Sequence, residues 1–308
     1  MDTSLHVFAP AKLNLFLELL DKRTDGYHEI ETVMVTLDRG DSLQVARRDA
    51  PGVELLEATW LPGTWSWHRR GVAVALPTSA DNLVVRALMR FAQHFRVDHG
   101  YSVRLFKRIP AAAGLGGASS DAAAVLRAAA RLSGLHPKTD ELRGLAAEVG
   151  SDVPFFLSAD RVHAAVATGR GEKIRPISLS RRWSFVVAYP PDGLSTAAVY
   201  AASRVPVQAR SAEPLIAGLQ NGNARQVYEA IFNRLQAPAD ASTPWVSILI
   251  KQLKQAGAAA AALTGSGSAC FGIFADVRSA RRAAARLNAT GSGLAFPASS
   301  HGKLGFSG

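Results

Sequence analysis

The sequence predicts an α+β protein of two domains, in which helices cover mixed or antiparallel sheets. Strand patterns follow one another in residues 7–46 with no helix between them, which favours a partly antiparallel sheet. A fresh set of strands and helices begins near residue 161, which favours a second αβ domain. At 308 residues the chain is long enough for both. We therefore expect domains at 1–162 and 163–308, the second ending in a tail that can be flexible.

The first domain is expected to begin with strands. Leucines occupy one parity of residues 7–19, and Lys12 and Asn14 the other, so a strand here projects Lys12 and Asn14 from one face. The segment 59–71 holds three tryptophans and predicts an extended hairpin or loop, to which we assign no role. The other expected elements are a turn at Asp25-Gly26, strands at 30–37 and 42–46, a helix at 81–95 and a strand at 101–107.

Helices and strands mix in the rest of the chain. Pro154 disfavours a helical conformation at Val153, so Asp152 is expected on a fixed bend, where an aspartate more often accepts a backbone hydrogen bond than acts in catalysis. The glycine-rich turn at 264–268 is expected to complete another pocket or to form a tight hairpin. The other expected elements are helices at 119–132, 139–149, 196–202, 224–235 and 244–255, and strands within 161–173 and at 185–189, 260–263 and 270–274.

The chain is basic, with a net charge of +10 and a pI of about 10.2, which favours polyanionic partners. The basic residues are scattered in short clusters such as Arg47-Arg48 and Arg181-Arg182, with few aromatic residues between them. A nucleic-acid-binding protein more often concentrates its charge or interleaves it with stacking rings. We therefore expect nucleotide phosphates rather than nucleic acid as the polyanion, and much of the excess charge on a solvated surface.

The single cysteine, Cys270, excludes a disulfide within the chain and favours a reducing compartment. It stands in the apolar run 269–274, which predicts a buried, inert thiol rather than a nucleophile. The first residues lack the basic start and apolar segment of a secretory signal, and no run reaches transmembrane length. We expect a cytoplasmic protein with no membrane partner.

The segment from Pro110 to Asp121 has the chemistry of a loop that binds a polyphosphate and opens a helix at about Ser119. Its glycines let the backbone approach an anion closely, while N–H groups and the helix dipole point at it. The loop does not match Gly-x-x-x-x-Gly-Lys-Ser/Thr, because no lysine precedes the serines, and Ser119 stands where the dinucleotide-binding motif has its third glycine. A simple change of chain direction with a serine N-cap is the alternative interpretation.

Three segments, at 9–15, 110–120 and 263–270, occur in the order and approximate spacing of the three motifs of the GHMP kinase superfamily, which the chain resembles over almost its whole length. Within that superfamily, four further segments resemble the family of 4-diphosphocytidyl-2-C-methyl-D-erythritol kinases: 25–29, 107–110, 150–156 and 168–172. The combined motifs are far more specific than any one of them. The resemblance implies the two-domain GHMP kinase fold, with an N-terminal ATP-binding domain and the active site in the cleft between the domains.

The same resemblance implies a reaction. The family uses ATP to phosphorylate the 2-hydroxyl of 4-diphosphocytidyl-2-C-methyl-D-erythritol, giving the 2-phosphate and ADP, in non-mevalonate isoprenoid synthesis. Lys12 and Asp152 match its catalytic pair. A carboxylate to orient and deprotonate the alcohol and a lysine to offset negative charge are adequate, because phosphoryl transfer needs placement and charge neutralisation more than covalent help. We expect Lys12 to lie near Asp152 and to keep it ionised.

The resemblance also implies binding residues. Residues 114–120 would hold the β and γ phosphates, with Ser119 or Ser120 contacting a Mg²⁺ ion for which the sequence names no secure carboxylate ligand. Asn82 with Leu83 would border the adenine. Tyr27 and His28 would hold the cytidine, Tyr200 would stack on it, and Asn14 would contact the methylerythritol hydroxyls. The implied ATP-binding residues are Lys107, Pro110, Ala111, Ala112, Ala113, Gly114, Leu115, Gly116, Gly117, Ala118, Ser119 and Ser120.

Two residues depart from the family pattern. Ala118 replaces the third glycine usual in the loop, and Arg234 stands where an acidic residue is common. Two alternatives stay open: another GHMP kinase, acting on homoserine, mevalonate or a sugar, and a protein that binds nucleotides or nucleic acid without catalysis. Tyr27, His28 and Tyr200 favour a cytidine-bearing small molecule as the partner. We expect a monomer or a weak homodimer.

Overall fold

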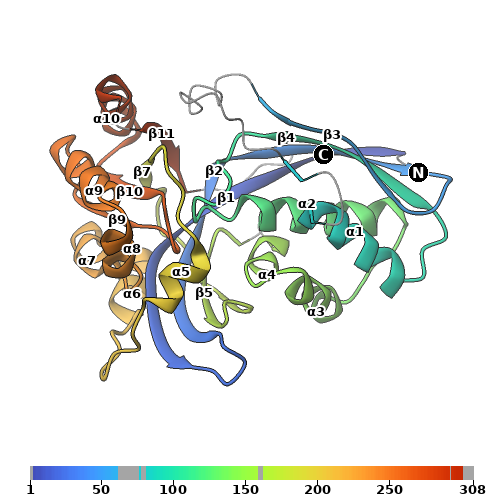
Figure 1. Ribbon diagram of the computed structural model, residues 1–308, viewed down its shortest axis with the longest axis horizontal. Helices are drawn as coiled ribbons and strands as arrows, with labels where there is room; N and C mark the ends of the chain where they lie inside the picture. The colour runs from blue at the N-terminus through green and yellow to red at the C-terminus, as the bar shows by residue number, and fades with distance from the viewer. Residues whose placement is uncertain (1–2, 62–75, 78–80, 159–161, 292, 301–308) are drawn as a thin grey trace. The chain divides into compact units, whose positions relative to one another are not determined.

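The computed structural model describes residues 3–61, 76–77, 81–158, 162–291 and 293–300 (Figure 1). Two compact units are distinguished, and neither is continuous in sequence. The first comprises Met1–Ala11, Arg39–Ala111 and Gly116–Ala159, and the second comprises Lys12–Asp38, Ala112–Leu115 and Asp160–Gly308. The mixture of sheets and helices confirms the predicted fold class, while the expected domain boundary after residue 162 stays a prediction.

The first unit combines four strands with four helices, which lie on one face of the strands (Figure 1). β2 pairs with β4 in antiparallel register, and β3 pairs with β4 in parallel. Fully buried Tyr101 and Phe91 meet edge to face, with ring centroids 6.4 Å apart. The elements are β3 (Val53–Trp60), β4 (Gly100–Lys107), α1 (Leu83–His94), α2 (Gly117–Leu132), α3 (Thr139–Val149), α4 (Val153–Leu157), and parts of β1 (Ser4–Lys22) and β2 (His28–Arg48).

The second unit contains a four-stranded antiparallel sheet in the order β11-β7-β10-β9, and the remainder of β1 and β2 with the strands they pair. β5 pairs with β2, β6 with β5, and β8 with β1. Its elements are β5 (Ala164–Gly169), β6 (Lys173–Pro176), β7 (Ser184–Tyr189), β8 (Phe232–Asn233), β9 (Ala260–Leu263), β10 (Cys270–Phe274), β11 (Leu294–Ser299), α5 (Thr196–Ala201), α6 (Glu213–Asn221), α7 (Ala224–Ala230), α8 (Gln236–Ser242), α9 (Trp245–Gln255) and α10 (Val277–Thr290).

Cys270 lies in the apolar core of this second unit, together with Val186, Leu253 and Leu287. Burial raises the pKa of its thiol, so the thiolate is disfavoured and the predicted inert cysteine is confirmed. Within the described residues, no helix is both long and apolar enough to span a bilayer.

The prediction of two strands at 30–37 and 42–46 is wrong, because β2 runs through both segments. Gly40 makes the continuous strand possible. A Cβ on Gly40 would lie 2.2 Å from the backbone oxygen of Ala9 in β1, so only a residue without a side chain lets the two strands approach here.

Asp152 lies in a turn, which fits the expected bend, but the expectation that Pro154 keeps Val153 out of a helix is wrong. Asp152 is the N-cap of α4, with φ −83° and ψ −12°, and Val153 already belongs to the helix. Pro154 lies in the first turn, where its missing N–H costs no intrahelical hydrogen bond. The side chain of Asp152 does not cap the helix, so its carboxylate is not committed to that local role.

The helix predicted at 224–235 ends at Ala230, because the next residues extend to pair with β1 as β8. Residues 59 and 60 belong to β3 and not to a loop, whereas Trp65 and Trp67 lie outside the described residues, as does the C-terminal tail. Elements that the sequence did not predict are β3, β8, β11, α4, α6, α8 and α10.

Arg234, the departure from the family pattern, pairs with a buried carboxylate. Its Nε and Nη2 each donate a 2.7 Å hydrogen bond to Glu18, which is 0% exposed. The backbone N–H groups of Leu19 and Arg210 donate to the same carboxylate. Burial alone would raise the pKa of Glu18, but these hydrogen bonds lower it. The acidic residue at this place in the fold is therefore Glu18 on β1, and Arg234 neutralises its charge.

Replacing Arg234 by Ala should lower the free energy of unfolding by about 2–3 kcal/mol, because it leaves the charge of Glu18 buried and unpaired. Urea denaturation at neutral pH measures this. Arg225→Ala is the matched control, since Arg225 pairs with Glu229 at the surface and its side chain is 87% exposed. Its loss should cost less than about 0.5 kcal/mol. Equal effects of the two substitutions would contradict the structural role of the Glu18–Arg234 pair.

Candidate phosphate-binding and catalytic site

The glycine-rich loop leads into α2, as the sequence predicts, but the helix begins at Gly117. Its N-cap is Gly116, which has a left-handed φ of +70° and provides no side-chain cap. The N–H of Ser120 already bonds to the backbone oxygen of Gly116, so both serines belong to the first turn and neither is the N-cap. The N–H groups that open α2 lack a capping side chain, and a phosphate is the kind of ligand that satisfies them.

Gly114 supplies a second left-handed position in the loop, with φ +75°. A Cβ at this residue would lie 2.2 Å from the backbone oxygen of Thr264, so steric contact and dihedral angle both require glycine. Ala112 also has a positive φ, of +52°, which L-residues with a side chain adopt only at a cost in conformational energy. Ala118, by contrast, lies in the first turn of α2 and is exposed.

Parts of all three motif segments meet within the second unit. The N–H of Lys12 in β1 donates to the backbone oxygen of Leu115 at 3.0 Å, and the N–H of Ala269 donates to that of Ala113 at 3.2 Å. The turn at 264–268 joins the antiparallel strands β9 and β10, so it forms a hairpin. The hairpin also contacts the centre of the glycine-rich loop before α2, so it forms part of that loop's surroundings.

Lys12 and Asn14 lie side by side on β1, 3% and 4% exposed, as their common parity predicts. The ammonium of Lys12 donates to Oδ1 of Asn14. The amide of Asn14 donates to the hydroxyl of Thr32 at 2.8 Å, and its backbone N–H donates to the hydroxyl of Thr264 at 2.9 Å. These contacts fix the orientation of the Asn14 amide and hold the lysine on the face from which both side chains project.

Asp152 belongs to the first unit and Lys12 to the second. Asp152 is half-buried at the start of α4. Within the first unit, the turn at residues 150–152 lies close to the start of α2. The hydroxyl oxygen of Ser119 is 4.0 Å from the place that a Cβ on Gly150 would occupy. The expected proximity of Lys12 and Asp152 stays a prediction.

Ser120 is a fitting contact for a cation. Its hydroxyl oxygen is buried in the first turn of α2 and has no hydrogen-bond partner among the described residues. An unpartnered buried oxygen beside a glycine-rich loop suits Mg²⁺, which prefers oxygen ligands and is usually shared with substrate phosphates. No group of three His, Cys, Asp or Glu side chains within the described residues forms a self-contained metal site.

Lys107, implied to lie near the nucleotide, is 4% exposed at the end of β4. Its Nζ is 2.5 Å from an oxygen of Asp41 and 2.7 Å from an oxygen of Asp121. Sequence reasoning missed both aspartates. Asp121 was part of the recognised loop segment but carried no assigned role, and Asp41 stands 66 residues from Lys107, so no local pattern connects them. Asn82, implied near the adenine, caps α1 by accepting from the N–H of Val84 at 3.0 Å.

The residues implied to bind cytidine lie within the second unit. The rings of His28 and Tyr200 are 5.6 Å apart and tilted by 35°. Burial lowers the pKa of His28, which favours its neutral form. Tyr27 is 54% exposed, and the guanidinium of Arg170 lies 5.0 Å from the centre of its ring. An exposed aromatic face and a neighbouring pair of rings can stack on a planar base.

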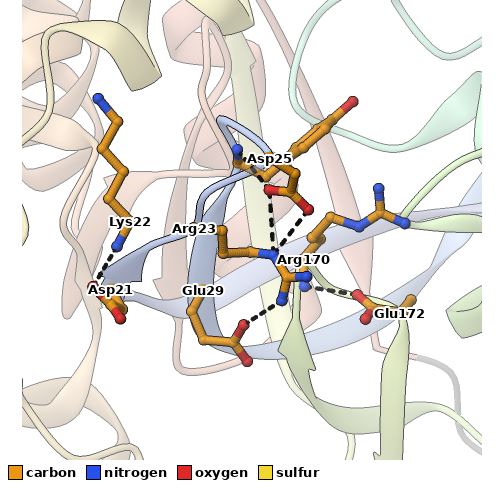
Figure 2. Close-up of polar contacts among 8 residues, drawn as sticks. Asp21, Lys22, Arg23, Asp25, Glu29, Arg170 and Glu172 are labelled. Carbon is orange, nitrogen blue, oxygen red and sulfur yellow. Dashed lines mark hydrogen bonds and ion pairs between the residues drawn. The ribbon is translucent and has the colours of Figure 1, made fainter.

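Ion pairs and hydrogen bonds hold the turn that carries Tyr27 and His28 (Figure 2). Arg23 donates to Glu29 at 2.9 Å and to Asp25 at 3.1 Å, which ties the end of β1 to the start of β2. The N–H of Tyr27 also donates to Asp25, and this bond, with Arg23, lowers the pKa of that carboxyl. The N–H of Arg170 donates to Glu172 at 2.6 Å, which fixes the adjoining turn. Sequence reasoning assigned no role to Arg23 or Arg170.

Sequence comparison places the chain among known kinases. The family models described as GHMP kinases N terminal domain and GHMP kinases C terminal match residues 82–160 and 215–293. The chain is 45% identical to the 4-diphosphocytidyl-2-C-methyl-D-erythritol kinase of Rhodopirellula baltica, covering 91% of this chain and 90% of that protein. It is 39% identical to the enzyme of the same name from Bacillus licheniformis, covering 86% of each.

Solved structures agree. A crystal structure of 4-(cytidine 5'-diphospho)-2C-methyl-D-erythritol kinase matches with a TM-score of 0.78 and 31% identity, covering 97% of this chain and all 100% of that one. Mevalonate kinase of L. major shares the fold, with a TM-score of 0.70 at 16% identity, covering 98% of each chain. These relationships confirm the resemblance predicted from the motifs. The chain belongs to the GHMP kinase superfamily and, within it, to the family of 4-diphosphocytidyl-2-C-methyl-D-erythritol kinases.

Proposed function

We propose that the protein transfers the γ-phosphoryl group of ATP to the 2-hydroxyl of 4-diphosphocytidyl-2-C-methyl-D-erythritol, giving the 2-phosphate and ADP in non-mevalonate isoprenoid synthesis. Membership of the GHMP kinases implies the use of ATP. The structural observation that supports this most is the loop before α2, whose left-handed Gly114 and Gly116 fit close approach to phosphates and whose centre contacts the other two motif segments. The single cysteine fits a reducing compartment, so we place the reaction in the cytoplasm, with no nucleic-acid or membrane partner.

Residues 114–120 of the loop bind the β and γ phosphates through backbone N–H groups and the N-terminus of α2, and residues 110–113 complete the ATP-binding segment. Ser120, with its unpartnered hydroxyl, is the protein ligand for Mg²⁺, and Ser119 lies next to it in the same turn. A Mg²⁺ ion held there would supply positive charge that offsets the negative charge of the phosphates. Lys107 belongs to the ATP site as well, in a supporting role.

Lys12 and Asp152 are the catalytic pair. Asp152 accepts the proton of the 2-hydroxyl and orients its oxygen toward the γ-phosphorus, and its carboxylate is not used in capping α4. Lys12 offsets the negative charge that develops during transfer, and its contact with Asn14 fixes where the ammonium lies. The protein forms no covalent bond, because positioning and charge neutralisation are what phosphoryl transfer requires.

Recognition of the acceptor falls to two groups of residues. Asn14, held by Thr32 and Thr264, contacts hydroxyls of the methylerythritol unit. Tyr27 and His28 hold the cytosine ring and Tyr200 stacks beside it, which accounts for the arrangement of the three rings in the second unit. The protein acts as a monomer or a weak homodimer.

Four acceptors test the function: the cytidyl substrate, homoserine, mevalonate and a sugar. ADP release from ATP should depend on the cytidyl substrate and exceed that with the other three by about a hundredfold or more in kcat/KM, because their hydroxyls are not oriented by a bound cytidine. Tyr200→Ala should raise KM for the cytidyl substrate by about tenfold and leave KM for ATP unchanged. Preference for another acceptor would point to a different GHMP kinase activity, and ATP binding without ADP release to a non-catalytic protein.

A further inference from the structure

Three charged side chains, Asp41, Lys107 and Asp121, form a buried cluster that takes no direct part in the proposed transfer. They are 0%, 4% and 2% exposed. One ammonium faces two carboxylates, at 2.5 Å and 2.7 Å. Buried charges are costly unless they are paired, so a cluster of this kind has to be held in one geometry by its surroundings.

The cluster joins the two ends of the phosphate loop. Ahead of the loop, Oδ1 of Asp41 accepts hydrogen bonds from the backbone N–H groups of Arg108 at 2.5 Å and Ile109 at 2.9 Å. Behind the loop, Asp121 projects from the start of α2. A Cβ on Gly117 would lie 3.2 Å from Nζ of Lys107 and 3.4 Å from Oδ2 of Asp41, so the first residue of α2 rests directly on the cluster.

We propose that Lys107 is a positioning residue, which together with Asp41 and Asp121 fixes both ends of the loop and does not itself bind the nucleotide. The proposal rests on the proposed function, because it assumes that the loop binds phosphate. Two of the three N–H donors of the ammonium point at carboxylates inside the protein, and almost none of the side chain is accessible. A loop that is held in its bound shape before ATP arrives loses less conformational entropy on binding.

The carboxylates of Asp41 and Asp121 differ in the hydrogen bonds that hold them. Burial disfavours the charged amine, but Asp121 and Asp41 outweigh it and raise the pKa of Lys107, so the ammonium stays charged. Asp121 is 2% exposed, and its Oδ1 has no hydrogen-bond partner among the described residues. Asp41, in contrast, accepts backbone bonds as well. Asp121 is therefore the less firmly held of the two carboxylates. Replacing it removes the contact between α2 and Lys107 while leaving the Lys107–Asp41 pair in place.

The experiment compares the wild-type protein with Asp121→Asn and Asp121→Ala. Calorimetry measures the Kd for ATP, and hydrogen exchange followed by mass spectrometry measures protection of the backbone over residues 108–120 without ligand. We expect Asp121→Ala to weaken ATP binding by about tenfold and to speed exchange in this segment. Asp121→Asn keeps an acceptor oxygen for the ammonium, so it should recover part of the loss, to about threefold weaker than wild type. Asp140→Ala, which removes an aspartate whose side chain is 95% exposed, should leave Kd and exchange unchanged.

The opposite order of affinities would overturn the proposal. If the Lys107 ammonium bound phosphate directly, removing the competing charge of Asp121 would leave ATP binding unchanged or strengthen it, most in Asp121→Ala. Should Asp121→Ala not fold, Asp121→Asn carries the same comparison. A wild-type protein that does not bind ATP would refute the proposed function. The exchange data would then still decide on the positioning cluster, since unchanged protection of 108–120 in both variants would refute it.

Discussion

Asp152→Asn should lower kcat by about a thousandfold, because the amide cannot accept the proton of the acceptor hydroxyl. Lys12→Met should lower kcat by about a hundredfold or more, because it removes a positive charge that offsets the developing negative charge while keeping most of the buried volume. Steady-state ADP release with the cytidyl acceptor measures both. Thermal melting should show the fold intact, since asparagine has the same shape as aspartate and the methionine side chain fills the buried site of the lysine.

Asp140→Asn is the matched control for the aspartate, because it makes the same chemical change on an exposed side chain of α3 in the same unit. Its kcat should equal that of wild type. Activity close to wild type in Asp152→Asn would remove the proposed base, and a variant that loses ATP binding along with turnover would show that Asp152 is needed for the loop rather than for proton transfer.

Gly114→Ala should lower kcat/KM for ATP by about a hundredfold and the free energy of unfolding by about 2–4 kcal/mol. The new methyl group would lie 2.2 Å from the backbone oxygen of Thr264, and the left-handed φ of +75° is itself unfavourable for alanine. The loop must therefore shift away from the turn at 264–268, and its N–H groups leave the positions that suit phosphates. Kinetics at varied ATP and urea denaturation measure the two effects.

Gly144→Ala provides the comparison, since Gly144 lies in α3 and a Cβ there meets nothing within 4 Å. That change should leave kinetics unaltered and stabilise the helix by up to about 1 kcal/mol. If Gly114→Ala behaved like Gly144→Ala, neither close contact with Thr264 nor the backbone conformation would matter for ATP binding.

Local signals carried much of what the sequence predicted. The run of alanine and leucine after Gly117 predicts α2, and the alternation around Lys12 and Asn14 predicts their common face, because both patterns arise within a few residues. Side-chain charge pairs were not predictable in this way. Glu18 and Arg234 are 216 residues apart, and only the pairing of β8 with β1 brings them together.

Other predictions failed where the sequence suggested that a strand or helix is interrupted. We expected a break in the strand at residues 38–41, whereas Gly40 permits close approach of β1 within a continuous β2. Pro154 suggested that Val153 is not helical, whereas the proline occupies the first turn of α4, where it is tolerated. In both cases the tertiary neighbour or the position within the element decided the local structure.

The interleaving of the two compact units along the chain has a consequence for biogenesis. Every residue of the first unit precedes residue 160, whereas the second draws on residues 12–38 and 112–115 as well as the C-terminal half. A growing chain on the ribosome can therefore assemble the first unit early, while the early strand segments of the second await partners translated much later. The C-terminal half expressed by itself would lack those strands and could not form the complete second unit.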